Sequence, residues 1–381
     1  MKLFKNQKDR KLLQSIFLAS AFGFFAGLAG QALGTVYFDP WRQHFLNYQT
    51  QVIQQQNNQT SDIQELKKVK KVIGTEQDFA VDQAIRKVDA SVVGFYPIKK
   101  ASQNILQSIY YPADLLGSGF ILTSDGWLAT DQSVVNENKK GLVVVVYQGQ
   151  EYKIDQLVTD PMTGITFVKI TANNLPVVLL GDSDELLAGQ LVVGDNSFGQ
   201  ASVDYVKSLN FQNQSTSQDY VLSSEKYARF ILLTNNLDNS YLGGPIINSN
   251  GEVVGVIQSN KNQTIVVPIN HFRPVLVSVF RDGSIRRSYL GVQYIDLSNT
   301  TSASDQQSGA LIYSQPKKNS PAANAKLQVG DVIISVENQL IDKTNSLAEI
   351  IQQYQSGDSL NLEVLRDDKN IKLNVSLSPL P

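Results

Sequence analysis

The 381-residue sequence contains no cysteine. Disulfide bonds, thiol nucleophiles and cysteine-ligated zinc sites are therefore excluded. The absence does not identify a redox compartment, because proteins on either side of a membrane can lack cysteine. Histidine is almost as scarce, since His44 and His271 are the only two in the sequence. Histidine is the usual proton shuttle near neutral pH, so a hydrolytic mechanism must use one of these two residues or do without an imidazole.

A strong net charge is also missing. The 33 basic side chains nearly balance the 35 acidic ones, which leaves a net charge of −2. No broad electrostatic attraction to nucleic acid is expected from this balance. No glycine-rich loop follows a predicted strand and opens a helix, so a nucleotide site lacks support, and no cofactor or metal is predicted. The composition is that of a globular protein, and the length favours two or three domains.

The N-terminal region has the pattern of a membrane anchor. A basic tail over residues 1–11 is followed by an apolar run over residues 12–38. About 20 apolar residues span a bilayer as a helix, and basic residues before the span place the N-terminus in the cytoplasm and the bulk outside. A cleaved signal peptide is the alternative, with Ala19-Ser20-Ala21 as the cleavage site. The apolar run continues well past this triplet, which favours an uncleaved, single-pass anchor in the cytoplasmic membrane.

A polar segment follows the predicted anchor. Residues 39–76 are rich in Gln and Asn and are expected to form a stalk that holds the folded part away from the membrane. Ile63, Leu66, Val69 and Ile73 recur at helical spacing, so a short amphipathic helix is the alternative for its second half.

Beyond residue 77 the pattern changes to short β-rich runs separated by turn residues. The predicted strands are Ser91–Tyr96, Gly119–Thr123, Leu142–Tyr147, Pro176–Leu180, Gln190–Val193, Phe230–Thr234, Val253–Gln258 and Thr264–Val267. Strands at this density, punctuated by turns, indicate an all-β sandwich or a pair of barrels.

Four longer motifs lie within this β-rich region. They read GSGFILTSDGWLATDQSVV at 117–135, TDPMTGITFVKI at 159–170, LGDSDELLAGQLVVGDNSFG at 180–199 and TNNLDNSYLGGPIINSNGEVVGV at 234–256. In this order and at these spacings they resemble the motifs of HtrA-family serine proteases. The resemblance implies that residues 77–280 form two chymotrypsin-like β-barrels with a cleft between them.

The same resemblance assigns the catalytic triad to residues that cannot carry out acyl transfer. The base histidine falls on Ser133, the orienting aspartate on Gly164 and the nucleophilic serine on Leu242. A serine is no base near neutral pH, glycine has no carboxylate, and leucine has no hydroxyl. Loss of the nucleophile or the base alone typically costs about a million-fold in turnover. The departures therefore predict a pseudoprotease without catalytic residues.

An active serine endopeptidase with a non-standard arrangement is the alternative. Ser240 lies two residues before Leu242, so a Ser–Lys mechanism with an unidentified lysine is conceivable. Asp131 and Asp160 also flank the site, although carboxylates beside a turn are more often solvated or capping. Tyr241 and Leu242 replace small residues of the family's oxyanion loop, and their apolar bulk either closes the cleft or forms an apolar docking surface.

Residues 286–381 resemble a bacterial PDZ domain. The framework segments are Gly309–Ile312, Ser320–Ala323 and Gly330–Ile333. One departure is Lys326, which stands where the family commonly has glycine. A helix is predicted over residues 346–354, and strands are predicted over 359–366 and 370–377.

The resemblance implies that this domain binds an extended chain end by strand addition, with loop N–H groups receiving the terminal carboxylate. The predicted peptide-binding residues are Tyr289, Leu290, Gly291 and Val292 in the loop, and Leu347, Ile350 and Ile351 on the helix. The alternative for the helix residues is that they belong to the hydrophobic core.

These features together predict a membrane-anchored, extracytoplasmic HtrA-like pseudoprotease. Its PDZ domain is expected to bind peptide C-termini or unfolded segments, in a role that regulates envelope protein quality control. HtrA-family proteins commonly trimerise through the N-terminal part of the protease domain, so Phe79–Tyr96 is expected to contribute to a homotrimer or to a mixed oligomer with an active relative. A purely structural scaffold, in which neither cleft nor groove binds anything, remains a third possibility.

Overall fold

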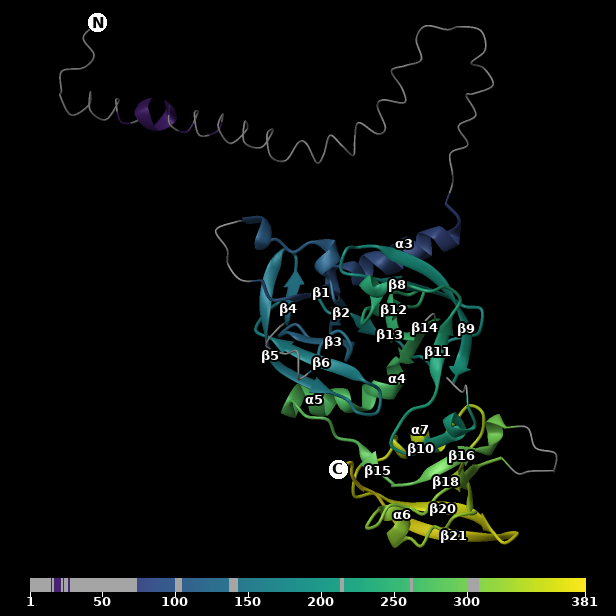
Figure 1. Ribbon diagram of the computed structural model, residues 1–381. Coiled ribbons are helices and arrows are strands. Elements are labelled where there is room, and N and C mark those ends of the chain that lie inside the picture. The colour runs from purple at the N-terminus through teal and green to yellow at the C-terminus, as the bar shows by residue number, and fades with distance from the viewer. Residues whose placement is uncertain are drawn as a thin grey trace, which may run out of the picture. The chain divides into compact units, whose positions relative to one another are not determined.

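A computed structural model of the protein describes residues 15, 17–21, 23, 27, 74–99, 105–136, 143–212, 216–260, 263–300 and 308–381 (Figure 1). The predicted basic tail, the stalk as far as residue 73 and His44 lie outside the described residues. The eight described residues of the predicted anchor are helical. In the described part of the chain, no helix is long and apolar enough to cross a bilayer. The anchor over residues 12–38 therefore stays a prediction.

The compact unit Gly74–Pro381 begins with a helix that was not predicted. Helix α3 covers Glu76–Val88, and Thr75 and Asp78 form a reciprocal capping box at its start. Its apolar side chains Ala84 and Val88 are buried in a core shared with the second barrel. The polar composition of the preceding stalk hid this helix, although the Thr–x–x–Asp capping signal was present.

The first barrel is closed. Its strands are β1 Val92–Pro97, β2 Gly117–Ile121, β3 Trp127–Asp131, β4 Val143–Tyr147, β5 Gln150–Thr159 and β6 Ile165–Ile170. They pair in the order β1-β2-β3-β6-β5-β4. Phe95, Ile121 and Val168 are fully buried in its interior.

The second barrel is built in the same way from the following residues. Its strands are β7 Leu179–Leu180, β8 Leu191–Asp195, β9 Ala201–Phe211, β11 Phe230–Leu233, β12 Pro245–Ile247, β13 Glu252–Asn260 and β14 Gln263–Pro268. The order is β12-β8-β9-β11-β14-β13-β7, and an additional β12–β13 pairing closes six of them into a barrel. Helices α4 Ile269–Phe272 and α5 Leu276–Asp282 follow. The mainly-β, double-barrel prediction is therefore confirmed.

The C-terminal part has its own sheet and core. Its elements are β15 Ser288–Tyr289, β16 Gln293–Asp296, β17 Ala310–Ile312, α6 Pro321–Asn324, β18 Val332–Val336, β19 Gln339–Leu340, α7 Leu347–Ile351, β20 Ser359–Arg366, β21 Lys369–Ser376 and β22 Ser378–Pro379. The predicted helix and final strands are confirmed by α7, β20 and β21. Lys326 has a φ of 61°, so the turn keeps the left-handed conformation that glycine favours even though a lysine occupies it.

One strand leaves the barrel to which its neighbours in sequence belong. Strand β10, Val221–Ser223, lies between β9 and β11 in the chain but pairs with β16 at the edge of the C-terminal sheet (Figure 1). The order of that sheet is β10-β16-β17-β18-β20-β21, with β19 attached to β18.

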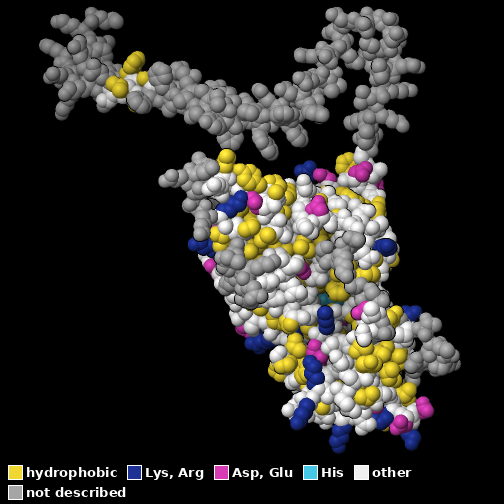
Figure 2. Space-filling view, viewed as in Figure 1, with side chains coloured by type: hydrophobic (Ala, Val, Ile, Leu, Met, Phe, Trp, Pro, Cys, Tyr) yellow, Lys and Arg dark blue, Asp and Glu magenta, His cyan; other side chains and the backbone are white. Residues whose placement is uncertain are grey.

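The remaining short helices are 3₁₀ turns. They are η1 Asp89–Ser91, η2 Ile105–Gln107, η3 Pro112–Asp114, η5 Ser217–Tyr220, η6 Asn239–Tyr241, η7 Arg273–Val275 and η8 Leu297–Asn299. On the face drawn in Figure 2, basic and acidic side chains are interspersed rather than segregated, as the small net charge implies.

Candidate functional site

The base position lies directly after strand β3 and is tied to a buried carboxylate. The backbone N–H and the hydroxyl of Ser133 both donate to Asp131 Oδ1, at 2.8 and 2.5 Å. Gln258 Nε2 donates to the other oxygen of Asp131 at 2.6 Å. Asp131 is only 4% exposed, and this burial raises the pKa of its carboxyl. The carboxylate is therefore buried and hydrogen-bonded, and of the two expected settings, solvated or capping, it has the capping one.

The orienting position is shaped for glycine. Gly164 has a φ of +74°, a conformation that side-chain-bearing residues rarely adopt. Its N–H donates to Asp160 O at 2.8 Å, and its carbonyl accepts from Gln132 N at 2.9 Å. A Cβ at this position would lie 2.8 Å from Gln132 Nε2. An aspartate placed here would meet both a strained backbone and an occupied space.

Asp160, at the start of the same turn, is fully buried and paired. Thr163 Oγ1 donates to its Oδ2 at 2.6 Å. Arg287 donates to both carboxylate oxygens, from Nε at 3.1 Å and from Nη2 at 2.5 Å. The Arg287 side chain is 1% exposed and that of Asp160 is 0% exposed. Asp160 is thus half of a buried ion pair, and it also accepts from Met162 N at 3.3 Å, the capping contact that was one of the two expected settings.

The nucleophile position follows η6, and its backbone groups are already engaged. In serine proteases the oxyanion hole uses the N–H of the nucleophile and that of the residue two before it. The equivalent donors here are Leu242 N, which donates to Asn239 O at 3.2 Å, and Ser240 N, which donates to Asp238 Oδ1 at 2.7 Å. Both N–H groups of the predicted oxyanion hole therefore have partners inside the loop.

The apolar side chains of this loop pack inward. Tyr241 is 8% exposed and belongs to the core of the second barrel. Leu242 is partly buried against the core of the first barrel. Of the two outcomes that the sequence left open, the packing favours a filled cleft over an apolar docking surface.

The hydroxyl of Ser240 is hydrogen-bonded to a carboxylate and to an amide. It donates to Asp238 Oδ1 and accepts from Asn196 Nδ2 at 2.9 Å. Within the described residues these bonds involve no lysine, so the Ser–Lys alternative gains no support from the geometry.

A further buried carboxylate lies beside this loop and was missed by the sequence analysis. Asp195 is 0% exposed, and its Oδ2 has no hydrogen-bond partner among the described residues. Burial, together with the charge of Asp89, raises the pKa of Asp195 to about 7. The only sequence signal was an aspartate in GDNSFG, a motif that otherwise resembles a neutral family segment.

This raised pKa predicts a pH-dependent stability. The pKa of Asp195 is higher in the folded state than in the unfolded state. The contribution of this carboxyl to the free energy of unfolding is therefore fully present at low pH and is lost as pH rises from about 4 to about 7. We expect Asp195→Asn to abolish this pH dependence. The difference in free energy of unfolding between variant and parent should therefore be about 3 kcal/mol larger, in favour of the variant, at pH 8 than at pH 5. Urea denaturation at both pH values measures it. The exposed Asp184→Asn serves as control, and a gain that does not change with pH would contradict the assignment.

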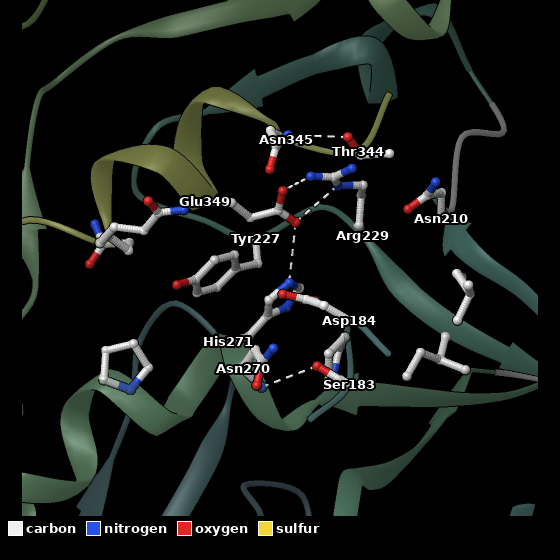
Figure 3. A pocket seen from close by; sticks show the side chains of 16 residues that line it. Ser183, Asp184, Asn210, Tyr227, Arg229, Asn270, His271, Thr344, Asn345 and Glu349 are labelled. Atoms are coloured by element: carbon white, nitrogen blue, oxygen red, sulfur yellow. Dashed lines mark hydrogen bonds and ion pairs between the residues drawn. The ribbon is translucent and has the colours of Figure 1, made fainter. Parts of the chain in front are cut away.

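His271 lies in a pocket between the second barrel and helix α7 with its flanking residues (Figure 3). The pocket has a volume of about 400 Å³. The imidazole stacks on Tyr227 with ring centres 4.0 Å apart, and its Nε2 lies 3.2 Å from Glu349 Oε1. Burial, with the charges of Arg229 and Arg287, lowers the pKa of His271 to about 3. The ring is therefore neutral, and its polar contact is with helix α7 rather than with Ser133 or Leu242.

Arg229 connects the second barrel to α7 in the same pocket. Its Nε donates to Glu349 Oε1 at 2.9 Å, and its Nη1 donates to Lys343 O at 2.6 Å. Figure 3 shows Glu349 reaching from α7 toward Arg229 and His271. This link between remote segments had no sequence signal.

The predicted carboxylate-binding loop is bonded to a segment of the same chain. Gly291 N donates to Glu225 Oε1 at 2.8 Å, and Val292 N donates to Ser224 Oγ at 3.1 Å. Tyr289 is 8% exposed and Leu290 is fully buried. The partners, Ser224 and Glu225, directly follow strand β10 and lie within the range 77–280 that was expected to form the barrels.

The predicted helix residues lie in the core. Leu347, Ile350 and Ile351 are each 0% exposed, and they pack with Leu290 in the C-terminal hydrophobic cluster. This arrangement agrees with the alternative that they are core residues. Leu222 of β10 packs against the same cluster.

Comparison with known proteins adds two domain assignments. A trypsin-like peptidase domain matches residues 117–256, and a PDZ domain matches residues 288–377. The chain is similar to proteins described as probable periplasmic serine endoproteases, DegP-like, at 30% identity over 279 residues in Pseudomonas putida (strain GB-1) and 31% over 277 residues in Marinomonas sp. (strain MWYL1). The alignments cover 71% and 70% of this chain and 57% of each relative. The chain thus spans little more than half the length of these curated relatives.

Solved structures share the fold. The HtrA-type protease AlgW with decapeptide superimposes with a TM-score of 0.58 at 20% identity, covering 79% of this chain and 98% of that one. The serine endoprotease from Yersinia pestis gives a TM-score of 0.53 at 21% identity, with coverages of 81% and 100%. At these identities the likeness concerns the arrangement of the domains' strands and helices.

Proposed function

The chain belongs to the HtrA-like proteins, in which a trypsin-like peptidase domain precedes a PDZ domain, and we propose that it is a non-catalytic receptor for polypeptide chain ends. The observation that carries this proposal is the hydrogen bond from Gly291 N to a carboxylate, that of Glu225. A loop amide that receives a side-chain carboxylate has the chemistry needed to receive a terminal one.

The absence of catalysis is supported by the peptidase site. Ser133, Gly164 and Leu242 supply neither a base, nor an orienting carboxylate, nor a nucleophile. The two oxyanion donors are engaged within the loop, and Leu242 fills space against the first barrel. The rival function, an active serine endopeptidase, is favoured by the names of the relatives.

The setting of this function is the cell envelope. The relatives described as periplasmic support an extracytoplasmic location and a role in protein quality control. The apolar run over residues 12–38 would anchor the chain in the cytoplasmic membrane. The resemblance to HtrA-family proteins favours a subunit contact through Phe79–Tyr96, in a homotrimer or in an oligomer with an active relative, and within this segment Phe79 is 59% exposed. The structure of the HtrA-type protease AlgW with decapeptide supports peptide binding by this chain.

The test is carboxylate-dependent binding. We expect the full chain to bind members of a C-terminal peptide library at least about tenfold more tightly as free acids than as amides, because a charge-assisted hydrogen bond is lost on amidation. Fluorescence anisotropy measures the two affinities side by side. Equal affinities for acid and amide would remove chain-end capture and leave the scaffold role.

A further inference from the structure

We propose that residues 221–225 are an internal ligand of the PDZ groove, which any external peptide must displace. The idea rests on the proposed function in that it concerns the same groove. Strand β10 occupies the edge of β16, the edge to which an incoming chain would add. Its pairing is antiparallel, with Val221 opposite Ile295 and Ser223 opposite Gln293.

The chain departs from its barrel to make this contact. Strands β9 and β11 flank β10 in sequence, and they pair with each other in the second barrel. The segment 216–226 between them therefore extends outward as a loop, and its middle forms a strand on another domain. Strand propensity depends on the neighbours that a strand packs against. The pairing of β10 with β16 places Leu222 opposite Tyr294, and cross-strand side-chain pairs of this kind stabilise a sheet.

The carboxylate of Glu225 takes the place of a chain terminus. Its Oε1 accepts from Gly291 N, and its Oε2 accepts from Ser223 Oγ at 2.8 Å. Ser224 N donates to Val292 O at 3.1 Å, and Val292 N donates to Ser224 Oγ. Strand pairing thus continues to Ser224, and the next residue supplies a negative charge to the loop. This is the pattern of a bound chain end, with a side chain in the role of the α-carboxylate.

An apolar contact and a nearby ion pair also hold this part of the chain against the PDZ domain. Leu222 lies opposite Tyr294 in the register and packs against the PDZ core. Four residues after Glu225, Arg229 bonds to Glu349 on α7. The segment is therefore held to the loop, to the edge strand and to the helix that together define a PDZ groove.

Competition follows from the covalent connection. A ligand within the same chain acts at an effective concentration in the millimolar range or above, without any gain in contact area. The apparent affinity for an external peptide equals its intrinsic affinity multiplied by the fraction of molecules in which the groove is open. Weakening the internal ligand must therefore increase binding of an external one.

The first experiment uses a probe taken from the chain itself. The probe is a fluorescein-labelled peptide with the sequence of residues 216–226, TSQDYVLSSEK, amidated at its C-terminus. We expect full-length Glu225→Ala to bind it at least about tenfold more tightly than the parent, because the internal segment loses a charge-assisted hydrogen bond while the probe keeps it. Glu185→Ala removes an exposed carboxylate from the second barrel and is expected to bind as weakly as the parent.

The second measurement uses an engineered disulfide. Because the sequence contains no cysteine, the two introduced thiols have no native thiol to pair with. Val221→Cys and Ile295→Cys place thiols on directly opposed residues of antiparallel strands, whose Cα atoms are about 4.5–5.5 Å apart, within the range that a disulfide spans. In the Glu225→Ala chain, oxidation of this pair is expected to abolish probe binding, and reduction to restore it. The control pair, Ser359→Cys with Ser376→Cys, joins β20 to β21 away from the groove, and its oxidation is expected to leave binding unchanged.

The outcomes separate this proposal from chain-end capture. Equal probe binding by parent and Glu225→Ala, binding after oxidation of the Val221→Cys, Ile295→Cys pair, or no binding by any chain would each overturn the internal ligand. Because the probe is amidated, its binding does not depend on recognition of free termini. A chain that behaves as expected here but does not prefer free-acid peptides would refute only the proposed function.

Discussion

Arg287→Met is expected to lower the free energy of unfolding by about 3–5 kcal/mol, a large part of the stability of a typical domain. The substitution leaves the Asp160 carboxylate, which is 0% exposed, without its guanidinium partner. Removing one member of a buried pair costs far more than the net gain from forming the pair, because an uncompensated charge remains in a low-dielectric interior. Urea denaturation of the full chain measures the effect.

The neighbouring arginine gives a matched control. Arg286 pairs with Asp282 at the surface, where its side chain is 66% exposed, so Arg286→Met is expected to change stability by less than about 0.5 kcal/mol. The double variant Asp160→Asn with Arg287→Met removes both charges, and it is expected to be more stable than Arg287→Met alone. Equal losses for the two arginine variants would show that burial of the Asp160–Arg287 pair is not what stabilises this region.

The Asp160–Arg287 pair also joins the first barrel to the PDZ domain. Asp160 begins the turn that ends at Gly164, and Arg287 directly precedes the first PDZ strand, β15. The same guanidinium donates to His271 O at 2.7 Å and thereby reaches the pocket where Arg229 meets Glu349. One buried cation thus connects the turn that ends at Gly164 to the start of the PDZ domain.

Local patterns in the sequence sufficed to predict a strand-rich fold, a sandwich or a pair of barrels, and the resemblance to HtrA-family proteases selected the barrels. Strands such as β1 and β13 carry runs of β-branched residues bounded by turn residues, and this signal depends only on near neighbours. The triad positions followed from motifs of the same local kind. The filling of the cleft by Leu242 did not, because it depends on which core the side chain meets after folding.

The features that were missed are those formed by distant residues. Asp160 and Arg287 are 127 positions apart, and Gly291 and Glu225 are 66 apart. Nothing in the composition around Asp160 indicates that an arginine will neutralise it, so the expectation was limited to a solvated or capping carboxylate. Strand β10 has three residues, too few for a periodic signal, and its pairing partner belongs to another domain.

Restoring the triad is expected not to restore activity. The variant Ser133→His, Gly164→Asp, Leu242→Ser supplies every side chain of the mechanism, yet we expect neither labelling by a fluorophosphonate nor cleavage of an unfolded protein. Gly164 has a positive φ, and a Cβ there would lie 2.8 Å from Gln132 Nε2, so the new aspartate is strained. An aspartate displaced by even about 1 Å loses much of its effect on the histidine.

The oxyanion loop is the stronger obstacle. Removing one oxyanion donor costs about 10²–10³ in turnover, and both donors here, Ser240 N and Leu242 N, are bonded within the loop. Adding Asp238→Ala to the triple variant frees Ser240 N from its side-chain acceptor and also removes the partner of the Ser240 hydroxyl. If the bonded oxyanion loop prevents activity, the triple variant is not labelled by a fluorophosphonate, and only the fourfold variant can be. Labelling of the triple variant itself would show that the loop rearranges readily, and the proposed inactivity of the parent would then depend on the three missing side chains alone.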